Sequence, residues 1–167
     1  MEPHMISRIV RDQREFYSSG ITRNMEYRRK QLKRLRDLIG RESGLIVEAL
    51  KKDLSKPVLE AYASEIALVR REIAYALKHL ESWARPRKVR SPLPLLPSAS
   101  FVVPEPLGVV LIIAPWNYPF QLAMAPLIGA IAAGNCAVIK PSELSPHTAG
   151  VIEELITRHM DPRHLSV

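Results

Sequence analysis

The stretch Gly108-Val-Val-Leu-Ile-Ile-Ala114 is a continuous apolar run, largely β-branched, and it decides the fold class of this 167-residue chain. A strand that is apolar on both faces is typical of a parallel sheet covered by helices. A second such run is Cys136-Ala-Val-Ile-Lys140. Between the two, residues 119–133 are apolar nearly all round, which predicts a helix buried on several sides.

The pattern continues toward the end of the chain. Ser145-Pro146 predicts the first turn of a helix that runs to about Met160. The last residues, His164-Leu-Ser-Val167, resemble the start of a third strand. The sequence therefore predicts an α/β fold, in which N-terminal helices precede the opening β-α-β-α of a doubly wound, Rossmann-like parallel sheet with right-handed crossovers.

The first part of the chain has a different composition. Residues 1–90 hold 21 Lys and Arg against 12 Asp and Glu, a net charge of +9, whereas residues 91–167 have a net charge of −2. Helical spacing predicts one helix that ends at Ser18-Ser19-Gly20 and a second that starts at Thr22 or Asn24. A third is expected from about Pro57 to Trp83, with these residues on its buried face: Leu59, Tyr62, Ala63, Ile66, Val69, Ile73, Leu77 and Leu80.

Proline marks the boundary between the two parts. Eleven of the fourteen prolines lie between Pro86 and Pro146. We therefore divide the chain into a helical segment (1–85), a proline-rich connector with a short strand near Phe101 (86–107) and an incomplete dinucleotide-binding domain (108–167).

The composition also argues against several classes of protein. With 47% apolar and 25% charged residues the chain is typical of globular proteins. A single Cys and five dispersed His predict no metal site. The basic run 28–36 is more typical of the solvated face of an amphipathic helix than of a nucleic-acid site. No apolar stretch has the length of a membrane span and no secretory signal is seen, so a cytoplasmic location is expected.

Candidate functional residues follow the two predicted strands. Ligands of open α/β sheets bind at the carboxyl ends of the strands. Ala114-Pro-Trp-Asn-Tyr-Pro-Phe120 follows the first strand, and Lys140-Pro-Ser-Glu143 contains the end of the second. Glu143 occupies the place where a dinucleotide fold hydrogen-bonds a ribose, and Lys140 is able to donate to a ribose or a phosphate. The simpler interpretations are loop charges for this pair, a helix cap for Asn117 and packing for Trp116.

Several motifs resemble those of one known family. The segments are Pro104-Glu-Pro-Leu-Gly-Val-Val, Ala-Pro-Trp-Asn-Tyr-Pro-Phe120 and Gly129-Ala-Ile-Ala-Ala-Gly-Asn-Cys-Ala-Val-Ile-Lys-Pro-Ser-Glu143. Together they resemble the N-terminal part of aldehyde dehydrogenases. Asp53-Leu-Ser-Lys-Pro57 and Glu60-Ala-Tyr-Ala-Ser-Glu-Ile66 resemble the class 3, fatty-aldehyde type branch.

The resemblance implies a chemistry and a set of roles. The family oxidises aldehydes to acids with NAD⁺ or NADP⁺, through a Cys nucleophile and a Glu that activates water. Asn117 matches the amide that donates to the developing oxyanion. Cofactor contacts are implied for Pro115, Trp116, Lys140, Ser142 and Glu143. The choice between NAD and NADP stays open, and a homodimer is implied for the intact enzyme.

Other family motifs are missing from the chain. It has no G-S-T-x-x-G turn, no E-L-G-G general-base motif and no G-Q-x-C nucleophile motif. Cys136 lies inside a predicted buried strand and is not a substitute nucleophile. We therefore expect an N-terminal fragment or truncated product that is inactive alone. The alternative is a remnant without catalytic function, or a fragment that associates with other chains through its strands.

Overall fold

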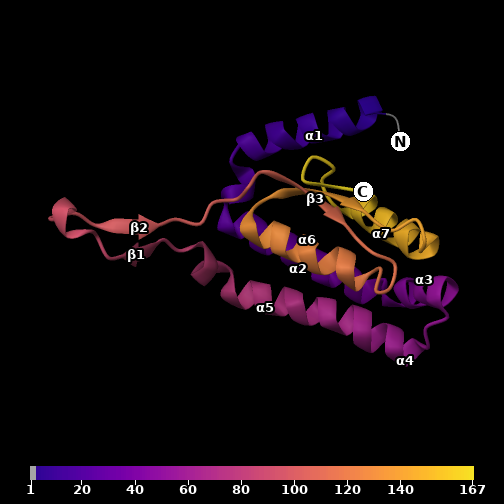
Figure 1. Cartoon of the computed structure of the whole chain (residues 1–167). Helices are drawn as coiled ribbons and strands as arrows, with labels where there is room; N and C mark the ends of the chain where they lie inside the picture. The colour runs from indigo at the N-terminus through magenta and orange to yellow at the C-terminus, as the bar shows by residue number, and fades with distance from the viewer. Residues whose placement is uncertain (1–2) are drawn as a thin grey trace.

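The computed structural model describes residues 3–167 as helices and a parallel sheet around a shared core, with a hairpin that projects from it (Figure 1). The helices are α1 (Pro3–Ser18), α2 (Met25–Arg41), α3 (Ser43–Leu54), α4 (Val58–Ala61), α5 (Ala67–Ala84), α6 (Gln121–Ala133) and α7 (Pro146–His159). The strands are β1 (Arg87–Val89), β2 (Ser100–Val102), β3 (Val109–Ile113), β4 (Cys136–Lys140) and β5 (Leu165–Ser166).

The sheet is parallel, with strand order β3-β4-β5. Val109 pairs with Cys136 at one end of β3, and Ile113 pairs with Lys140 at the other. Helix α6 connects β3 to β4, and α7 connects β4 to β5. The predicted α/β class, the two long strands and the third strand at the end of the chain are therefore confirmed.

Two helices cover the sheet from opposite sides. Both α1 and α6 contact β3 and β4, and Figure 1 shows the sheet between them. Alternate side chains of β4 point to opposite faces of the sheet. The Cys136 thiol lies 3.6 Å from the Gln13 carbonyl of α1, whereas Ala137 and Ile139 are buried in the main core on the other face. Helices α2 and α5 pack on the far side of α6, so α6 is buried by the sheet and by helices, as its composition predicts.

The predicted second helix is two helices. Asn24, one of the two predicted caps, accepts hydrogen bonds from the backbone N–H groups of Glu26 (2.8 Å) and Tyr27 (3.1 Å) and starts α2. The helix then breaks at Glu42, between Gly40 and Gly44. Glycine lowers helix stability by about 1 kcal/mol relative to alanine, so the break falls where the helix is intrinsically weakest.

The predicted buried face of the third helix is wrong at its beginning. Leu59, Tyr62 and Ala63 are exposed, whereas Ala61 and Glu65 are fully buried. The cause is a π-helical segment, Tyr62–Ile66, between α4 and α5. A π-turn holds one residue more than an α-turn and so rotates the preceding residues by roughly 100° off the buried face.

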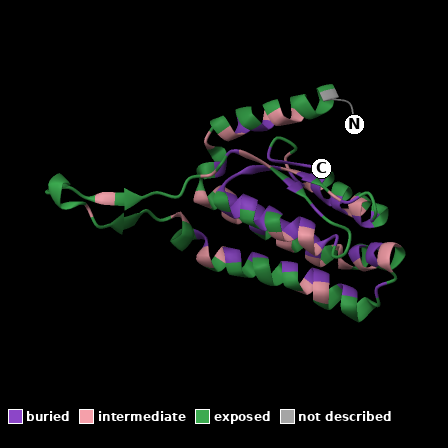
Figure 2. Ribbon diagram, in the orientation of Figure 1, coloured by how far each residue is buried: buried purple, intermediate pink, exposed green. Residues whose placement is uncertain are grey.

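The proline-rich connector forms an antiparallel hairpin. Strand β1 pairs with β2, with Arg87 opposite Val102 and Val89 opposite Ser100. The strand near Phe101 was expected, whereas β1 was not, because its basic residues show no apolar alternation. The hairpin extends away from the rest of the molecule and is almost wholly exposed (Figures 1 and 2).

A long-range contact starts α7. The carboxylate of Asp53, near the end of α3, accepts hydrogen bonds from the N–H of His147 (3.1 Å) and from the N–H and hydroxyl of Thr148 (both 2.7 Å). A carboxylate at this place satisfies free N–H groups and interacts favourably with the helix dipole. Helices α3 and α7 are therefore joined by a polar contact as well as by apolar packing.

His164 is buried among aromatic rings. Its ring centroid lies 5.3 Å from that of Tyr27 and 6.1 Å from that of Phe16, and its Nε2 lies 3.2 Å from the carbonyl oxygen of Asn135. Burial lowers the pKa of His164 to about 4. The neutral ring is thus the form that the folded protein accommodates.

This burial predicts a loss of stability in acid. Because the pKa of His164 is lower in the folded than in the unfolded protein, neutral His164 contributes fully to the free energy of unfolding above the unfolded pKa of about 6.5. This contribution is lost as the pH falls through about 4, and the total loss is on the order of 3 kcal/mol. Urea unfolding of a full-length protein that carries this chain, between pH 7 and pH 4, measures the loss. The slope should flatten in His164→Phe but not in the exposed-site control His147→Ala; an unchanged slope in His164→Phe contradicts the prediction.

The exposed apolar side chains of β3 predict poor behaviour of residues 1–167 alone. Leu111 and Ile113 are 63% and 68% exposed, and β3 has a neighbouring strand on one side only among residues 3–167. An open apolar edge favours pairing with other chains. We therefore expect aggregation or a broad thermal transition. Because Cys136 lies in a buried strand and is not a substitute nucleophile, we also expect no NADH formation with a medium-chain aldehyde. Turnover that disappears in Cys136→Ser, from a chain with a sharp cooperative transition, would contradict both expectations.

Candidate functional site

The two candidate loops meet at one edge of the sheet. Ile113 and Lys140 are paired at the carboxyl ends of β3 and β4, and the N–H of Ala114 donates to the carbonyl of Lys140 over 3.0 Å. The segment 114–120 therefore starts beside the segment 140–143. This confirms that the motif residues gather at the strand ends, where open α/β sheets bind ligands.

The side chain of Asn117 is exposed at this edge. Within residues 3–167 its amide has no hydrogen-bond partner, so it is free to donate to a ligand. The cap interpretation of Asn117 is wrong, because the first N–H groups of α6 have another acceptor. Both Phe120 N–H (2.9 Å) and Gln121 N–H (3.0 Å) donate to Oε2 of Glu65.

A buried ion pair lies beneath the loop. Glu65 has no exposed surface and comes from the π-helical segment, while Lys56 is 8% exposed and follows α3. The Lys56 ammonium donates to Oε1 of Glu65 and, over 3.3 Å, to the carbonyl of Asn117. It also lies 4.0 Å from the centre of the Tyr118 ring, a cation–π contact.

Pro115 and Trp116 lie at the surface. Pro115 is exposed, and the indole of Trp116 is 50% exposed. About half of the Trp116 surface is therefore accessible, and both the packing interpretation and a contact with a ligand remain open. The role of these two residues in cofactor binding stays a prediction.

Lys140 and Glu143 form an exposed ion pair. The ammonium of Lys140 donates to Glu143 Oε2 over 2.7 Å and to the carbonyl of Pro141 over 3.2 Å. The hydrogen bond from Lys140 holds the pKa of the Glu143 carboxyl below its usual range. The carboxylate is therefore ionised at neutral pH and able to accept hydrogen bonds from hydroxyl groups.

Ser142 differs from its neighbours because it is buried. Its hydroxyl oxygen accepts from the N–H of Leu144 over 3.2 Å, and its carbonyl accepts from the N–H of Ser145 over 3.3 Å. These bonds hold the turn that carries Glu143. A direct contact of Ser142 with a cofactor stays a prediction.

Cys136 is inert in this structure. It is fully buried in β4, and burial raises the pKa of its thiol to about 11. The thiol is therefore protonated at neutral pH, whereas a nucleophile has to be a thiolate.

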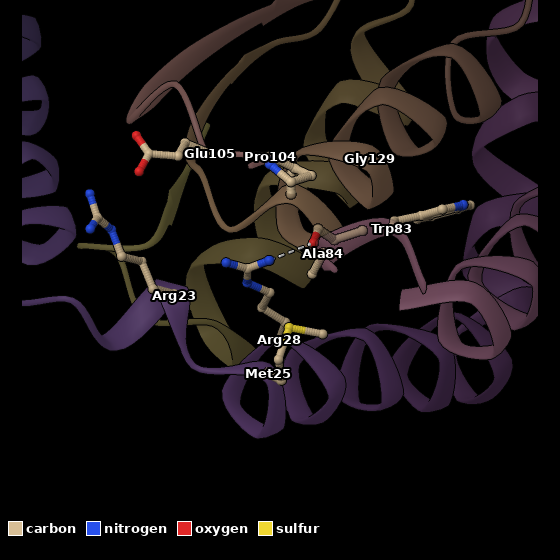
Figure 3. Close-up of a pocket in the computed structure, with 10 residues that line it drawn as sticks. Arg23, Met25, Arg28, Trp83, Ala84, Pro104, Glu105 and Gly129 are labelled. Atoms are coloured by element: carbon tan, nitrogen blue, oxygen red, sulfur yellow. Dashed lines mark hydrogen bonds between the residues drawn. The ribbon is translucent and has the colours of Figure 1, made fainter. Parts of the chain in front are cut away.

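A pocket of about 370 Å³ lies at the other end of α6. Figure 3 shows Arg28 at its centre, where the guanidinium donates to the carbonyls of Ala132 (3.2 Å) and Thr22 (2.8 Å). Gly134 has a φ of +89°, and a Cβ there would lie 2.5 Å from the guanidinium. Arg28 is thus a cap for the carboxyl end of α6, where a positive charge is favourable.

Residues 3–167 contain neither a cluster of metal ligands nor a helix fit to span a membrane. No three His, Cys, Asp or Glu side chains are grouped so as to hold a metal ion. Nor does any helix in that range combine the length and the apolar character that crossing a membrane requires.

Lys56 and Glu65 were not predicted as site residues from the sequence. A usable signal was present, since Glu65 lies four residues before Val69, on the spacing of the buried residues Ile73, Ala76 and Leu80. An acidic residue at an apolar helical position indicates a buried partner. Lys56 could not be predicted as the partner of Glu65, because nothing in the local sequence pattern links residue 56 to the loop after β3.

Comparison with known proteins identifies the family. The model of the aldehyde dehydrogenase family matches residues 4–165. Aldehyde dehydrogenase family 3 member H1 of Arabidopsis thaliana is 43% identical over 161 residues, which are 96% of this chain and 33% of that protein. This similarity supports the class 3 resemblance.

Solved structures agree with this similarity. The substrate-bound state of Staphylococcus aureus AldH has a TM-score of 0.94 and 46% identity, over 97% of this chain and 35% of that one. Succinic semialdehyde dehydrogenase from Streptococcus pyogenes, in complex with NADP⁺, shares the fold with a TM-score of 0.87 at 20% identity, over 99% of this chain and 36% of that one. The chain spans about a third of the length of these relatives, and it belongs to the aldehyde dehydrogenase family.

Proposed function

We propose that this chain is the N-terminal, cofactor-binding part of an NAD(P)⁺-dependent aldehyde dehydrogenase that oxidises an aldehyde to a carboxylic acid. The observation that carries the proposal is the amide of Asn117, unpartnered among the described residues, at the carboxyl edge of the sheet beside the loop of Lys140 and Glu143. The family match supplies the reaction class. The aldehyde itself stays open.

Asn117 serves as the oxyanion donor in this proposal. When an aldehyde carbonyl is attacked, negative charge develops on its oxygen, and a fixed N–H donor stabilises that charge. An amide suits the task because it is neutral and releases the product, whereas a cationic group would retain the carboxylate. The nucleophile and the general base are outside the motifs that this chain carries.

The residues around Glu143 suit an adenosine ribose. The ionised carboxylate of Glu143 accepts hydrogen bonds from ribose hydroxyls, Lys140 donates to a hydroxyl or a phosphate, and Pro115 and Trp116 offer an apolar surface. The bound nicotinamide would accept the hydride of the aldehyde. A carboxylate at residue 143 repels a 2′-phosphate, but the choice between NAD and NADP stays open.

The strand order supports a Rossmann-like sheet. In the common doubly wound order the first three strands lie side by side as 3-2-1, and β5-β4-β3 has this arrangement. We propose that further strands continue the sheet beyond β3, next to the exposed Leu111 and Ile113. The three-part division at residues 85 and 107 also remains a proposal: the hairpin projects by itself, while the helical segment shares one core with the sheet.

The projecting hairpin supports a homodimer of the intact protein. Large apolar side chains on it are exposed: Leu93, Leu95, Leu96, Phe101, Val102 and Val103. Contiguous exposed apolar residues of this kind mark interaction surfaces. The cytoplasmic location expected from the sequence stays a prediction.

The same surfaces favour the second candidate, a non-catalytic fragment that associates with other chains. The exposed Leu111 and Ile113 on β3 are the observation in its favour. The gene sequence downstream of codon 167 separates the two candidates. An open frame that encodes a G-Q-x-C motif supports the enzyme, and a stop codon supports the fragment.

Asn117→Ala tests the oxyanion role. In a full-length protein that carries this chain, kcat should fall by about 10²-fold or more while the Kd of NAD⁺ stays within about 2-fold, because the amide acts on the transition state. Steady-state kinetics and cofactor titration measure the two effects. A variant with full kcat, or one whose only defect is unfolding, contradicts the role.

Glu143→Ala tests the cofactor edge. The change removes an acceptor for the 2′-hydroxyl of NAD⁺ and a repulsion against the 2′-phosphate of NADP⁺. The full-length variant should therefore lose affinity for NAD⁺ more than for NADP⁺, measured as the ratio of the two KM values. The exposed acidic residue Glu153 provides a matched control, Glu153→Ala, which should leave the ratio unchanged. Equal losses for both cofactors count against the assignment.

A further inference from the structure

We propose that Lys56 and Glu65 act as a positioning clamp for the loop 114–120, which holds the Asn117 amide in its productive orientation. The inference rests on the proposed oxyanion role of Asn117. It adds two residues, one from the loop after α3 and one from the π-helical segment, to the groups on which the rate of aldehyde oxidation depends.

Glu65 fixes the end of the loop. Its Oε2 accepts from the N–H groups of Phe120 and Gln121, at 2.9 and 3.0 Å, where α6 begins. The carboxylate has no exposed surface, so solvent does not compete for these bonds. A charged acceptor at a helix N-terminus is stabilised both by the N–H groups and by the helix dipole.

Lys56 fixes the middle of the loop. Its ammonium donates to Glu65 and to the backbone carbonyl of Asn117, at 3.3 Å for the latter, and lies against the ring of Tyr118. The contact with Asn117 uses the main chain, which leaves the side-chain amide free. Lys56 and Glu65 together thus hold the residues on both sides of that amide.

Two local irregularities bring the pair together. Ser55, just before Lys56, has a left-handed backbone with a φ of +53°, which non-glycine residues rarely adopt. Glu65 lies in the π-helical segment Tyr62–Ile66, in register with the buried face of α5. Strained backbone and π-turns are both frequent at functional sites.

Stability alone does not account for the pair. Burying two charges has a desolvation cost that their attraction often fails to repay, and apolar replacements are frequently as stable. A pair that serves only packing would therefore tolerate apolar substitution. A pair that positions Asn117 would not, because the bonds to Phe120, Gln121 and the Asn117 carbonyl would be lost.

Glu65→Gln is a near-isosteric test variant. Glu65 receives hydrogen bonds from donors on both sides, from Lys56 at Oε1 and from the backbone at Oε2. A glutamine has one oxygen only, so its NH₂ group must face a donor. Lys56→Met removes the donor on one side. In the double variant the NH₂ group no longer faces an ammonium, so the double variant should recover part of the loss.

The experiment uses the full-length protein that carries this chain. Glu65→Gln and Lys56→Met should each lower kcat by about 10- to 100-fold, as small misplacements of a catalytic group do, while KM for NAD⁺ stays within about 2-fold. Hydrogen exchange should accelerate at the amides of Phe120 and Gln121 in both variants. Lys56→Arg, which keeps the charge and the donors, should retain more kcat than Lys56→Met.

Arg28→Met is the matched control, because Arg28 caps the opposite end of α6. Arg28→Met should lower the unfolding temperature by about as much as Glu65→Gln does. Its kcat, corrected for the folded fraction, should stay within about 2-fold of the wild-type value. A fall in kcat as large as that of Glu65→Gln would overturn the clamp, since general loosening of α6 would then explain both.

The remaining outcomes distinguish failure of the Lys56–Glu65 clamp from failure of the proposed aldehyde dehydrogenase function. Exchange that does not change at Phe120 and Gln121 overturns the clamp, whatever the activity. Exchange that accelerates without a loss of kcat overturns its catalytic role. A wild-type protein that oxidises no aldehyde overturns the proposed function, and the exchange measurement still tests the clamp.

Discussion

The parallel pairing of β3 with β4 is the constraint on which the rest of the molecule depends. Parallel neighbours cannot be joined by a short turn, so the chain has to cross back over the sheet, and α6 is that crossing. The crossing places the start of α6 at the carboxyl edge of the sheet, with free N–H groups that need acceptors. It also buries the helix, so an acceptor has to come from the protein. Glu65 is that acceptor, and the ordered loop before α6 follows from it.

The basic N-terminal helices contribute both to the core and to the contacts at the two ends of α6. Their apolar faces, with Leu32, Leu35 and Ile39 on α2 and Ile73 and Leu80 on α5, join the same core as α6 and the sheet. Polar side chains from these helices and from the loop after α3 bind the segments at the two ends of α6: Glu65 and Lys56 at the start, and Arg28 at the end. Most of the other Lys and Arg side chains of residues 1–90 are exposed, on these helices and on the hairpin.

The sequence predicted what local patterns determine and missed what distant contacts determine. The apolar runs 108–114 and 136–140 predicted parallel strands correctly, because burial on both faces leaves a continuous apolar signal. Asn24 was predictable as a cap, since it bonds to N–H groups two and three residues away. The π-turn at Tyr62–Ile66 was not, because it accompanies a contact of Glu65 with a loop 55 residues further along the chain, and no local pattern reveals that contact. Glu143 was found by its place at the end of the second strand and the role of Asn117 by family resemblance, and the structure adds that the Asn117 amide has no partner within residues 3–167.

One short segment, residues 53–56, touches both halves of the candidate site. Asp53 holds the first turn of α7, directly after the loop of Glu143, and Lys56 holds the loop of Asn117. The two contacts are three residues apart, across the single left-handed residue Ser55. The loop of Glu143 and the loop of Asn117 are therefore mechanically linked through one turn of chain. A displacement of that turn shifts both loops at once, so under the proposed roles of Glu143 and Asn117 cofactor affinity and the rate of the chemical step would be energetically coupled.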